Sequence, residues 1–153
     1  MNKPEIRKAQ ELLLGILPHW NYRIARPFKQ LLADGMSLEM YYCLYTLIWF
    51  DDKLLTVTEL ANCVQMSKQQ VSKIVNRLVE YDFVKRIYDK TDRRIIKLQV
   101  TPKASEYIDH YLQNNANCFV SLLNRMSEED LSDFNKALET LQHIFWNYRY
   151  EQE

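Results

Sequence analysis

Two closely spaced helix starts followed by a charged hairpin constrain this 153-residue chain more than any other feature. Thr56–Glu59 has the capping-box pattern, in which a threonine hydroxyl and a glutamate carboxylate satisfy each other's backbone donors at the start of a helix. Ser67–Gln70 repeats the pattern a few residues later. This spacing leaves room for one short helix and a tight turn before the next helix begins, so it predicts a helix-turn-helix.

Two segments rich in β-branched and aromatic residues follow. Val84–Tyr88 and Ile95–Val100 flank the charged stretch Asp89–Arg94, which predicts two strands joined by a hairpin with a basic tip. A helix-turn-helix with such a ribbon is a winged helix-turn-helix, a module that reads DNA. Only two glycines and four prolines occur in the chain, so the remainder is expected to be helical. The predicted fold class is mainly α with a small β-wing.

The chain divides into three parts, which together form one domain. Residues 1–50 are expected to form N-terminal helices, residues 51–103 the winged module, and residues 104–153 C-terminal helices. Thr101-Pro102 predicts the start of a long amphipathic helix that runs to about Leu123. Ser127, followed by three acidic residues, is the expected cap of a last helix.

Residues that break or cap helices divide the N-terminal part. Pro18 predicts a kink or a break in the first helix, and Pro27 is a second disturbance. Gly35 is expected to end the helix that precedes it. Ser37 can then cap a helix over Leu38–Phe50.

Charge is distributed unevenly along the chain. The whole sequence is neutral, with 20 basic and 20 acidic residues. The segment from Leu55 to Lys103, however, has ten basic and five acidic residues, which gives it a net charge of +5 and leaves −5 elsewhere. Positive charge collected on one module of a neutral protein fits local contact with phosphates.

The helix after Ser67 has one apolar face and one polar face. Its apolar residues recur at helical spacing and are Val71, Ile74, Val75 and Leu78. The expected DNA-contacting residues are Ser67, Lys68, Gln69, Gln70, Ser72, Lys73 and Arg77. Glutamine can pair with adenine and lysine can donate to guanine in the major groove, whereas Arg77 is better placed for a phosphate. The alternative is a solvated helix face, but such faces usually mix both signs of charge.

The wing tip adds three cations, Lys90, Arg93 and Arg94. Asp92 and Arg94 are two residues apart on an extended chain, so their side chains share a side and the carboxylate can hold the arginine in one pose. Either arginine could then reach into a narrow minor groove. Taken alone, this segment would be read as an ordinary charged hairpin. Because it follows the helix that begins after Ser67, which we call the recognition helix, the DNA-binding interpretation is favoured.

These motifs together resemble the MarR family of bacterial regulators. The resemblance is carried by Leu60-Ala61, Val71–Leu78, Phe83–Arg86, Asp92–Arg94, Leu98 and Val100–Pro102, and the order of elements extends it over essentially the whole chain. Two positions depart from the family pattern, because Asp82 and Ala104 stand where the family often has glycine. Aspartate tolerates the left-handed backbone that a helix end needs at position 82.

The resemblance implies a homodimer in which the first helix and the last two pack against their symmetry mates. Two recognition helices would then lie about one DNA turn apart on a pseudo-palindrome. Family members often respond to small aromatic ligands, and the dense aromatic cluster of the first 50 residues suits such an effector. The pocket candidates are Trp20, Arg23, Tyr41 and Tyr45. Plain core packing is the alternative role for each.

Other chemistry is poorly represented. Three cysteines and three histidines are scattered, so neither a disulfide framework nor a metal site is expected. Cys43 is expected to be a buried, inert thiol, with a redox-responsive regulator acting through it as an alternative. We find no nucleophile elbow, phosphate loop or carboxylate pair, so neither an enzyme nor a cofactor is expected.

The leading hypothesis is a cytoplasmic regulator, a ligand-responsive repressor that binds double-stranded DNA and does not contact membranes. No apolar stretch is long enough to span a bilayer, and no signal-peptide core follows Met1. The rival class is a winged-helix protein-interaction module, because fold alone does not fix function.

Overall fold

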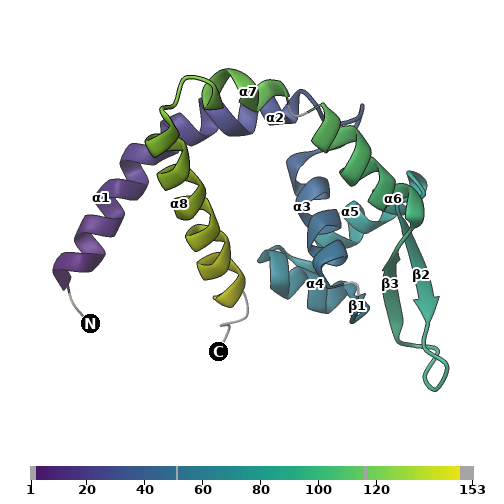
Figure 1. Ribbon diagram of the computed structural model, residues 1–153. Helices are drawn as coiled ribbons and strands as arrows, with labels where there is room; N and C mark the ends of the chain where they lie inside the picture. The colour runs from purple at the N-terminus through teal and green to yellow at the C-terminus, as the bar shows by residue number, and fades with distance from the viewer. Residues whose placement is uncertain (1–2, 51, 116, 149–153) are drawn as a thin grey trace.

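The computed structural model describes residues 3–50, 52–115 and 117–148, and these form an arch (Figure 1). Helices α1 (Lys3–Trp20) and α8 (Glu128–Asn147) descend from the top of the arch, where α2 (Arg26–Lys29) packs against α7 (Asn117–Leu123). The winged module forms the opposite side. The predicted fold class is therefore confirmed. The predicted domain limits at residues 1, 51 and 153 lie outside the described residues.

The first helical run is less interrupted than its prolines predict. Helix α1 continues through Pro18, so the predicted break there is wrong. The irregularity comes later, as the π-helical segment η1 (Asn21–Ala25), in which Arg26 N donates to Asn21 O. Pro27 stands in the first turn of α2, where a missing backbone N–H leaves no donor unpaired.

A tight turn and a capped helix lead into the module. Helix α2 ends at Lys29, so Gly35 does not end it as predicted. Gly35 instead lies in a turn closed by a 2.9 Å bond from Met36 N to Ala33 O, with a φ of +80°. Helix α3 (Leu38–Trp49) then begins as predicted, with Ser37 Oγ accepting from Met40 N at 3.1 Å.

The winged module contains two short helices and a three-stranded sheet. Both predicted capping boxes form, at the starts of α4 (Val57–Val64) and α5 (Lys68–Glu80). Strands β2 (Val84–Tyr88) and β3 (Ile96–Val100) form the predicted antiparallel hairpin. A third strand, β1 (Leu55–Thr56), pairs with the other edge of β3 and was not predicted.

Asp82 ends α5 in the left-handed conformation that the sequence allows, with a φ of +58°. Phe83 N donates to Leu78 O and Asp82 N donates to Val79 O, both at 2.9 Å. This is a Schellman arrangement, and aspartate takes the position usually occupied by glycine. The chain therefore turns from the recognition helix into β2 without an unpaired backbone group at these positions.

The C-terminal part is more divided than predicted. The single long helix expected after Thr101 is resolved into α6 (Pro102–Glu106), the π-helical segment η2 (Tyr107–Leu112) and α7. Helix α8 begins as predicted, with Ser127 Oγ accepting from Asp130 N at 3.1 Å. Near its far end, the ring of Trp146 stacks on Trp49 of α3 with centroids 4.7 Å apart.

The hydrophobic core lies between α3 and the winged module. The largest fully buried side chains include Leu44, Leu60, Leu78 and Leu98, which come from α3, α4, α5 and β3. Helices α1, α7 and α8, in contrast, bury no described residue. No helix in the described part of the chain combines the length and apolarity needed to cross a bilayer.

Candidate nucleic-acid interface

Helix α5 has the two-faced character that its sequence predicts. The fully buried residues on its inner face are Val71, Val75 and Leu78. Gln69, Lys73 and Asn76 lie one or two turns apart on the exposed outer face. Among the predicted contact residues, Ser72 is only half-exposed. The outer face therefore presents amide and ammonium groups without a carboxylate until Glu80.

The capping box at the start of α5 occupies two of the predicted contact residues. Ser67 Oγ accepts from Gln70 N at 3.2 Å. Gln70 Oε1 in turn accepts from Ser67 N at 3.1 Å and from the Ser67 hydroxyl at 3.0 Å. Bidentate pairing with adenine needs a free amide oxygen. While the box is intact, exposed Gln69 is therefore a better placed reader of bases than Gln70.

Arg77 lies in the last turn of the recognition helix, α5. Its Nη2 donates to the carbonyl oxygen of Gly35 at 3.3 Å. Neighbouring Tyr81 donates its hydroxyl proton to the carbonyl oxygen of Asp34. Arg77 is thus partly engaged by the turn before α3, and only its remaining N–H groups can reach a phosphate.

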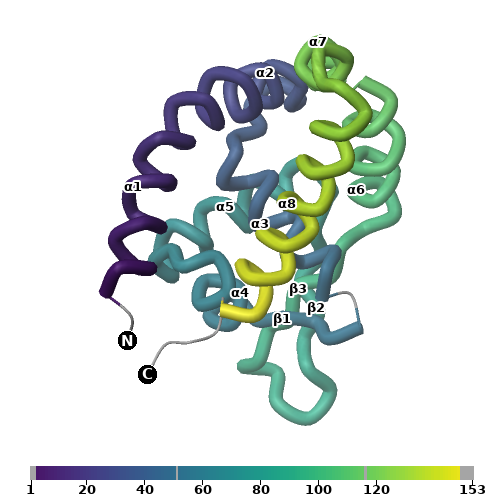
Figure 2. The backbone as a smooth tube through the Cα atoms, turned by 60° about the vertical axis from the view of Figure 1, so that its left-hand side comes forward, coloured from purple at the N-terminus to yellow at the C-terminus, as the bar shows by residue number. Residues whose placement is uncertain are grey.

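The β2–β3 hairpin projects beyond the helices of the module (Figure 2). At its tip, Asp92 Oδ1 accepts from Arg94 N at 3.0 Å and lies 3.4 Å from Arg94 Nε. The carboxylate is therefore paired with Arg94, whose side chain is 94% exposed, and its role in orienting the arginine stays a prediction. Lys90 and Arg93 are also exposed at the tip, and neither forms an ion pair with another described residue.

Asp89 shapes the bend of the hairpin. Its Oδ1 accepts from Thr91 Oγ1 at 2.6 Å, from Thr91 N at 2.9 Å and from Asp92 N at 3.2 Å. The hydroxyl and the two backbone N–H groups favour the charged carboxylate, so the pKa of Asp89 is lowered to about 2. Lys97 Nζ lies 3.7 Å from the other carboxylate oxygen. The hydrogen bonds to Asp89 thereby stabilise the loop that carries the exposed cations.

Arg86 contacts the exposed face of the recognition helix, a contact that the sequence reasoning did not predict. It lies on β2 opposite Leu98 and donates from Nη2 to Oδ1 of Asn76 on the recognition helix. Side chains alternate along a strand, so Val84 and Arg86 share a face. Because Val84 is buried against the module, that alternation could have placed Arg86 beside α5.

The proposed pocket residues lie on three elements, α1, η1 and α3. The ring of Tyr41 lies 5.9 Å from that of Tyr45, and burial raises the pKa of Tyr41 to about 12. Trp20 is 41% exposed on α1. Arg23 lines a separate hollow with Cys118.

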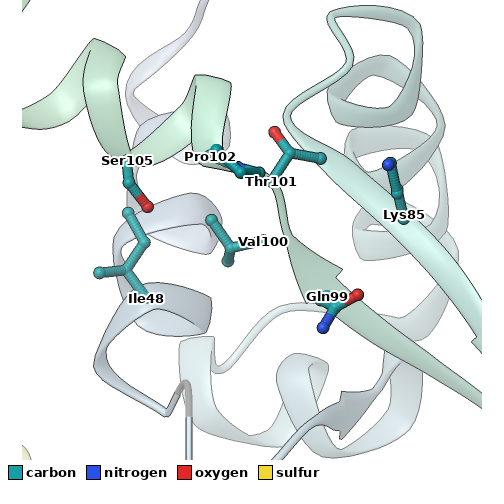
Figure 3. Close-up of a pocket in the computed structure, with 7 residues that line it drawn as sticks. All are labelled: Ile48, Lys85, Gln99, Val100, Thr101, Pro102 and Ser105. Carbon is teal, nitrogen blue, oxygen red and sulfur yellow. The ribbon is translucent and has the colours of Figure 1, made fainter.

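A hollow lies where α3, the sheet and α6 meet. Its volume is about 370 Å³, and Figure 3 shows Ile48, Val100 and Ser105 approaching one another from these three elements. Lys85 and Gln99, which are partners in the β2–β3 register, line its other side. The hollow thus combines apolar walls with a cation, an amide and hydroxyl groups.

Cys43 lacks the properties of an oxidant sensor. Burial, and next to it the charge of Glu39, raises the pKa of Cys43 to about 12. Burial also raises the pKa of Cys118. A sensor needs an exposed thiolate, so the structure argues against a redox role for Cys43. No cluster of three or more metal-ligating side chains occurs among the described residues.

Comparisons with known proteins agree with this fold. Residues 34–95 match the family model described as the MarR family. The HTH-type transcriptional regulator YsmB of Bacillus subtilis is 21% identical over 89 residues, which are 58% of this chain and 61% of that protein. The transcriptional repressor MprA of Escherichia coli is 26% identical over 99 residues, which are 65% of this chain and 56% of that protein. The chain thus spans about three-fifths of the length of these two relatives.

A solved structure extends the likeness to the whole fold. The structure of a MarR family protein from Bacillus stearothermophilus superposes with a TM-score of 0.66 at 19% identity, covering 94% of this chain and 96% of that one. The fold and its exposed basic face define a winged helix-turn-helix protein. Within that class, the chain is similar to the MarR family over residues 34–95, the family that its sequence motifs resemble.

Proposed function

We propose that this protein is a transcriptional regulator that binds double-stranded DNA sequence-specifically. It acts in the cytoplasm, as a repressor of the genes that it controls. The carrying observation is that Gln69 and Lys73 on α5 and Arg93 and Arg94 on the wing are all exposed. Amide and ammonium groups on a helix of this kind suit the major groove, and arginines on a wing suit the minor groove. The similarity to YsmB, a transcriptional regulator, and to MprA, a transcriptional repressor, supports the same function.

The proposed working form is a homodimer. Leu12 and Leu14 on α1 are 63% and 71% exposed, and Phe145 on α8 is 68% exposed. Apolar faces of this size on the helices outside the core favour burial against a partner. A second copy of the chain would supply the same faces by two-fold symmetry and place two recognition helices about one DNA turn apart.

A small effector would act by favouring a dimer whose recognition helices no longer match the operator. The hollow between α3, the sheet and α6 is a candidate site, because its lining combines apolar walls with a cation, an amide and hydroxyl groups. The alternative candidates are Trp20, Arg23, Tyr41 and Tyr45, which a partner subunit would have to help enclose. An aromatic compound is the proposed effector class.

The test is a titration of the purified protein against labelled DNA from immediately upstream of its own gene, with a scrambled duplex as control. Selective binding that weakens steeply between two salt concentrations supports the proposal. Failure of a folded dimer to bind either duplex, together with early elution from heparin, would favour a protein-interaction module instead.

A further inference from the structure

The turn at Ala33–Met36 contacts two elements that are remote from each other in sequence. On one side, Ala33 N donates to the hydroxyl oxygen of Tyr107, the first residue of η2, at 3.0 Å. On the other side, the carbonyl oxygens of Asp34 and Gly35 accept from Tyr81 and Arg77 at the rear of the recognition helix. The turn therefore joins α5 to the helical connector over residues 102–115.

Aromatic rings join the same two elements a second time. The ring of buried Phe83 lies 5.6 Å from that of Tyr81 and 5.0 Å from that of Tyr107. Lys103 donates from Nζ to Tyr81 O at 2.9 Å, and its ammonium lies 5.6 Å from the centre of the Phe83 ring. Tyr81 and Tyr107 thus both contact the ring of Phe83 and both bond to the turn at Ala33–Met36. We call this closed set of contacts the circuit.

Gly35 is required by this circuit for two reasons. Its φ of +80° is a backbone conformation that side chains disfavour. A Cβ at this position would also lie 2.5 Å from Tyr81 Oη and 3.1 Å from Arg77 Nη2. Only a glycine lets the backbone of the turn approach the recognition helix so closely.

We propose that Tyr81 and Tyr107 are positioning residues that fix the recognition helix relative to the connector leading to α7 and α8. The connector begins at the capped start of α6 and continues into the π-helical segment η2, so it leads directly from the wing toward the terminal helices. Tyr107 is the residue of this connector that accepts a hydrogen bond from the turn. The inference rests on the proposed function, because its consequence appears only in a dimer bound to DNA.

The consequence concerns the spacing of DNA half-sites. In a dimer held by its terminal helices, the distance between the two recognition helices depends on how firmly each α5 is held to its own connector. A firm attachment penalises an operator whose half-sites are one base pair too close or too far apart. A loosened attachment lets α5 adapt, so the penalty becomes smaller.

The experiment compares operators that differ only in half-site spacing. A duplex is first selected from a random-sequence pool with the wild-type protein, and one base pair is then inserted or deleted at its centre. We expect Tyr107→Phe to reduce the affinity ratio between the selected and shifted duplexes by about 3- to 10-fold, the effect of about one hydrogen bond. Tyr111→Phe is the matched control, because its ring stacks on Tyr107 at 5.2 Å but its residue is 45% exposed.

The outcomes separate this inference from the proposed function. Failure to select any duplex with the wild-type protein would contradict DNA recognition itself. A selected duplex with the same spacing penalty for wild type and Tyr107→Phe would overturn the positioning role. If Tyr107→Phe proves unfolded by thermal melting, Tyr81→Phe tests the same circuit from the recognition helix, and an unchanged penalty there would equally overturn it.

Discussion

Arg86 on β2 donates a hydrogen bond to Asn76 on α5, and this bond joins the wing to the recognition helix. Asn76 lies on the exposed face of α5 with Lys73, the face proposed to enter the major groove. The bond therefore sets the wing beside the helix before DNA arrives. Both residues are exposed, so the contact orients the interface rather than supporting the core.

Removing this bond should weaken DNA binding without unfolding the protein. We expect Arg86→Ala to lower operator affinity by about tenfold, because a charge-assisted hydrogen bond and a nearby cation are both lost. Titration of the operator and a thermal melt measure the two effects. Lys85→Ala removes an equal charge from the neighbouring residue, whose side chain points to the opposite face, and should cost clearly less. Equal losses for both variants would mean that only charge matters.

The pair formed by Asp92 and Arg94 gives a prediction in which two physical effects have opposite signs. Asp92→Ala adds one unit of positive charge to the module, which by itself would strengthen binding to DNA. If the carboxylate orients Arg94, the same substitution should instead weaken operator binding by about 3- to 10-fold. Glu80→Ala makes the same change of charge on α5 and should strengthen binding slightly. Stronger binding by Asp92→Ala would refute the orienting role.

Asp89 predicts a dependence of stability on acid. Because its pKa is about 2 in the folded protein and 3.8 ordinarily, the charged carboxylate stabilises the fold above about pH 4 and this contribution is lost as the pH falls toward 2. Between about pH 5 and pH 2, the melting temperature of the wild type should therefore fall more than that of Asp89→Asn. The expected difference is small, since the carboxylate is partly exposed to solvent. Parallel curves for the two proteins would argue against it.

The exposed apolar faces predict the effect of a single charge on assembly. Leu14→Asp places a carboxylate on the α1 face that is proposed to be buried between subunits, so it should shift the protein toward monomer and abolish high-affinity operator binding. Asn62→Asp is the control, because it adds the same charge on an exposed position of α4. Sedimentation equilibrium measures the association. An unchanged dimer of Leu14→Asp would place the interface elsewhere.

Local signals were readable from the sequence because their partners are close along the chain. The capping boxes at Thr56 and Ser67 need only residues three positions apart, and the buried face of α5 follows from the spacing of Val71, Val75 and Leu78. The pairing of the Arg94 side chain with the Asp92 carboxylate was predictable for the same reason.

Contacts across the fold were not readable in this way. The approach of the Gly35 turn to Tyr81 depends on how α5 packs against the residues before α3, which no periodicity encodes. Pro18 misled the prediction, because the surrounding residues keep the helix intact and the π-helical segment follows later. The two-residue strand β1 is too short to leave a pattern of alternation.

The central claim is that α5 and the wing read DNA together. The most direct measurement is operator affinity at several salt concentrations for wild type, Lys73→Ala, Arg94→Ala and Lys136→Ala. Lys136 is an exposed lysine on α8, so its removal changes the net charge equally but lies outside the module.

We predict that Lys73→Ala and Arg94→Ala each weaken binding by about 1–3 kcal/mol, and that a residue touching a phosphate also reduces the salt slope by about one. Lys136→Ala should leave both quantities at their wild-type values. If all three variants bound the operator like the wild type, with unchanged salt slopes, the assignment of the recognition helix and wing as the DNA-reading surface would be contradicted.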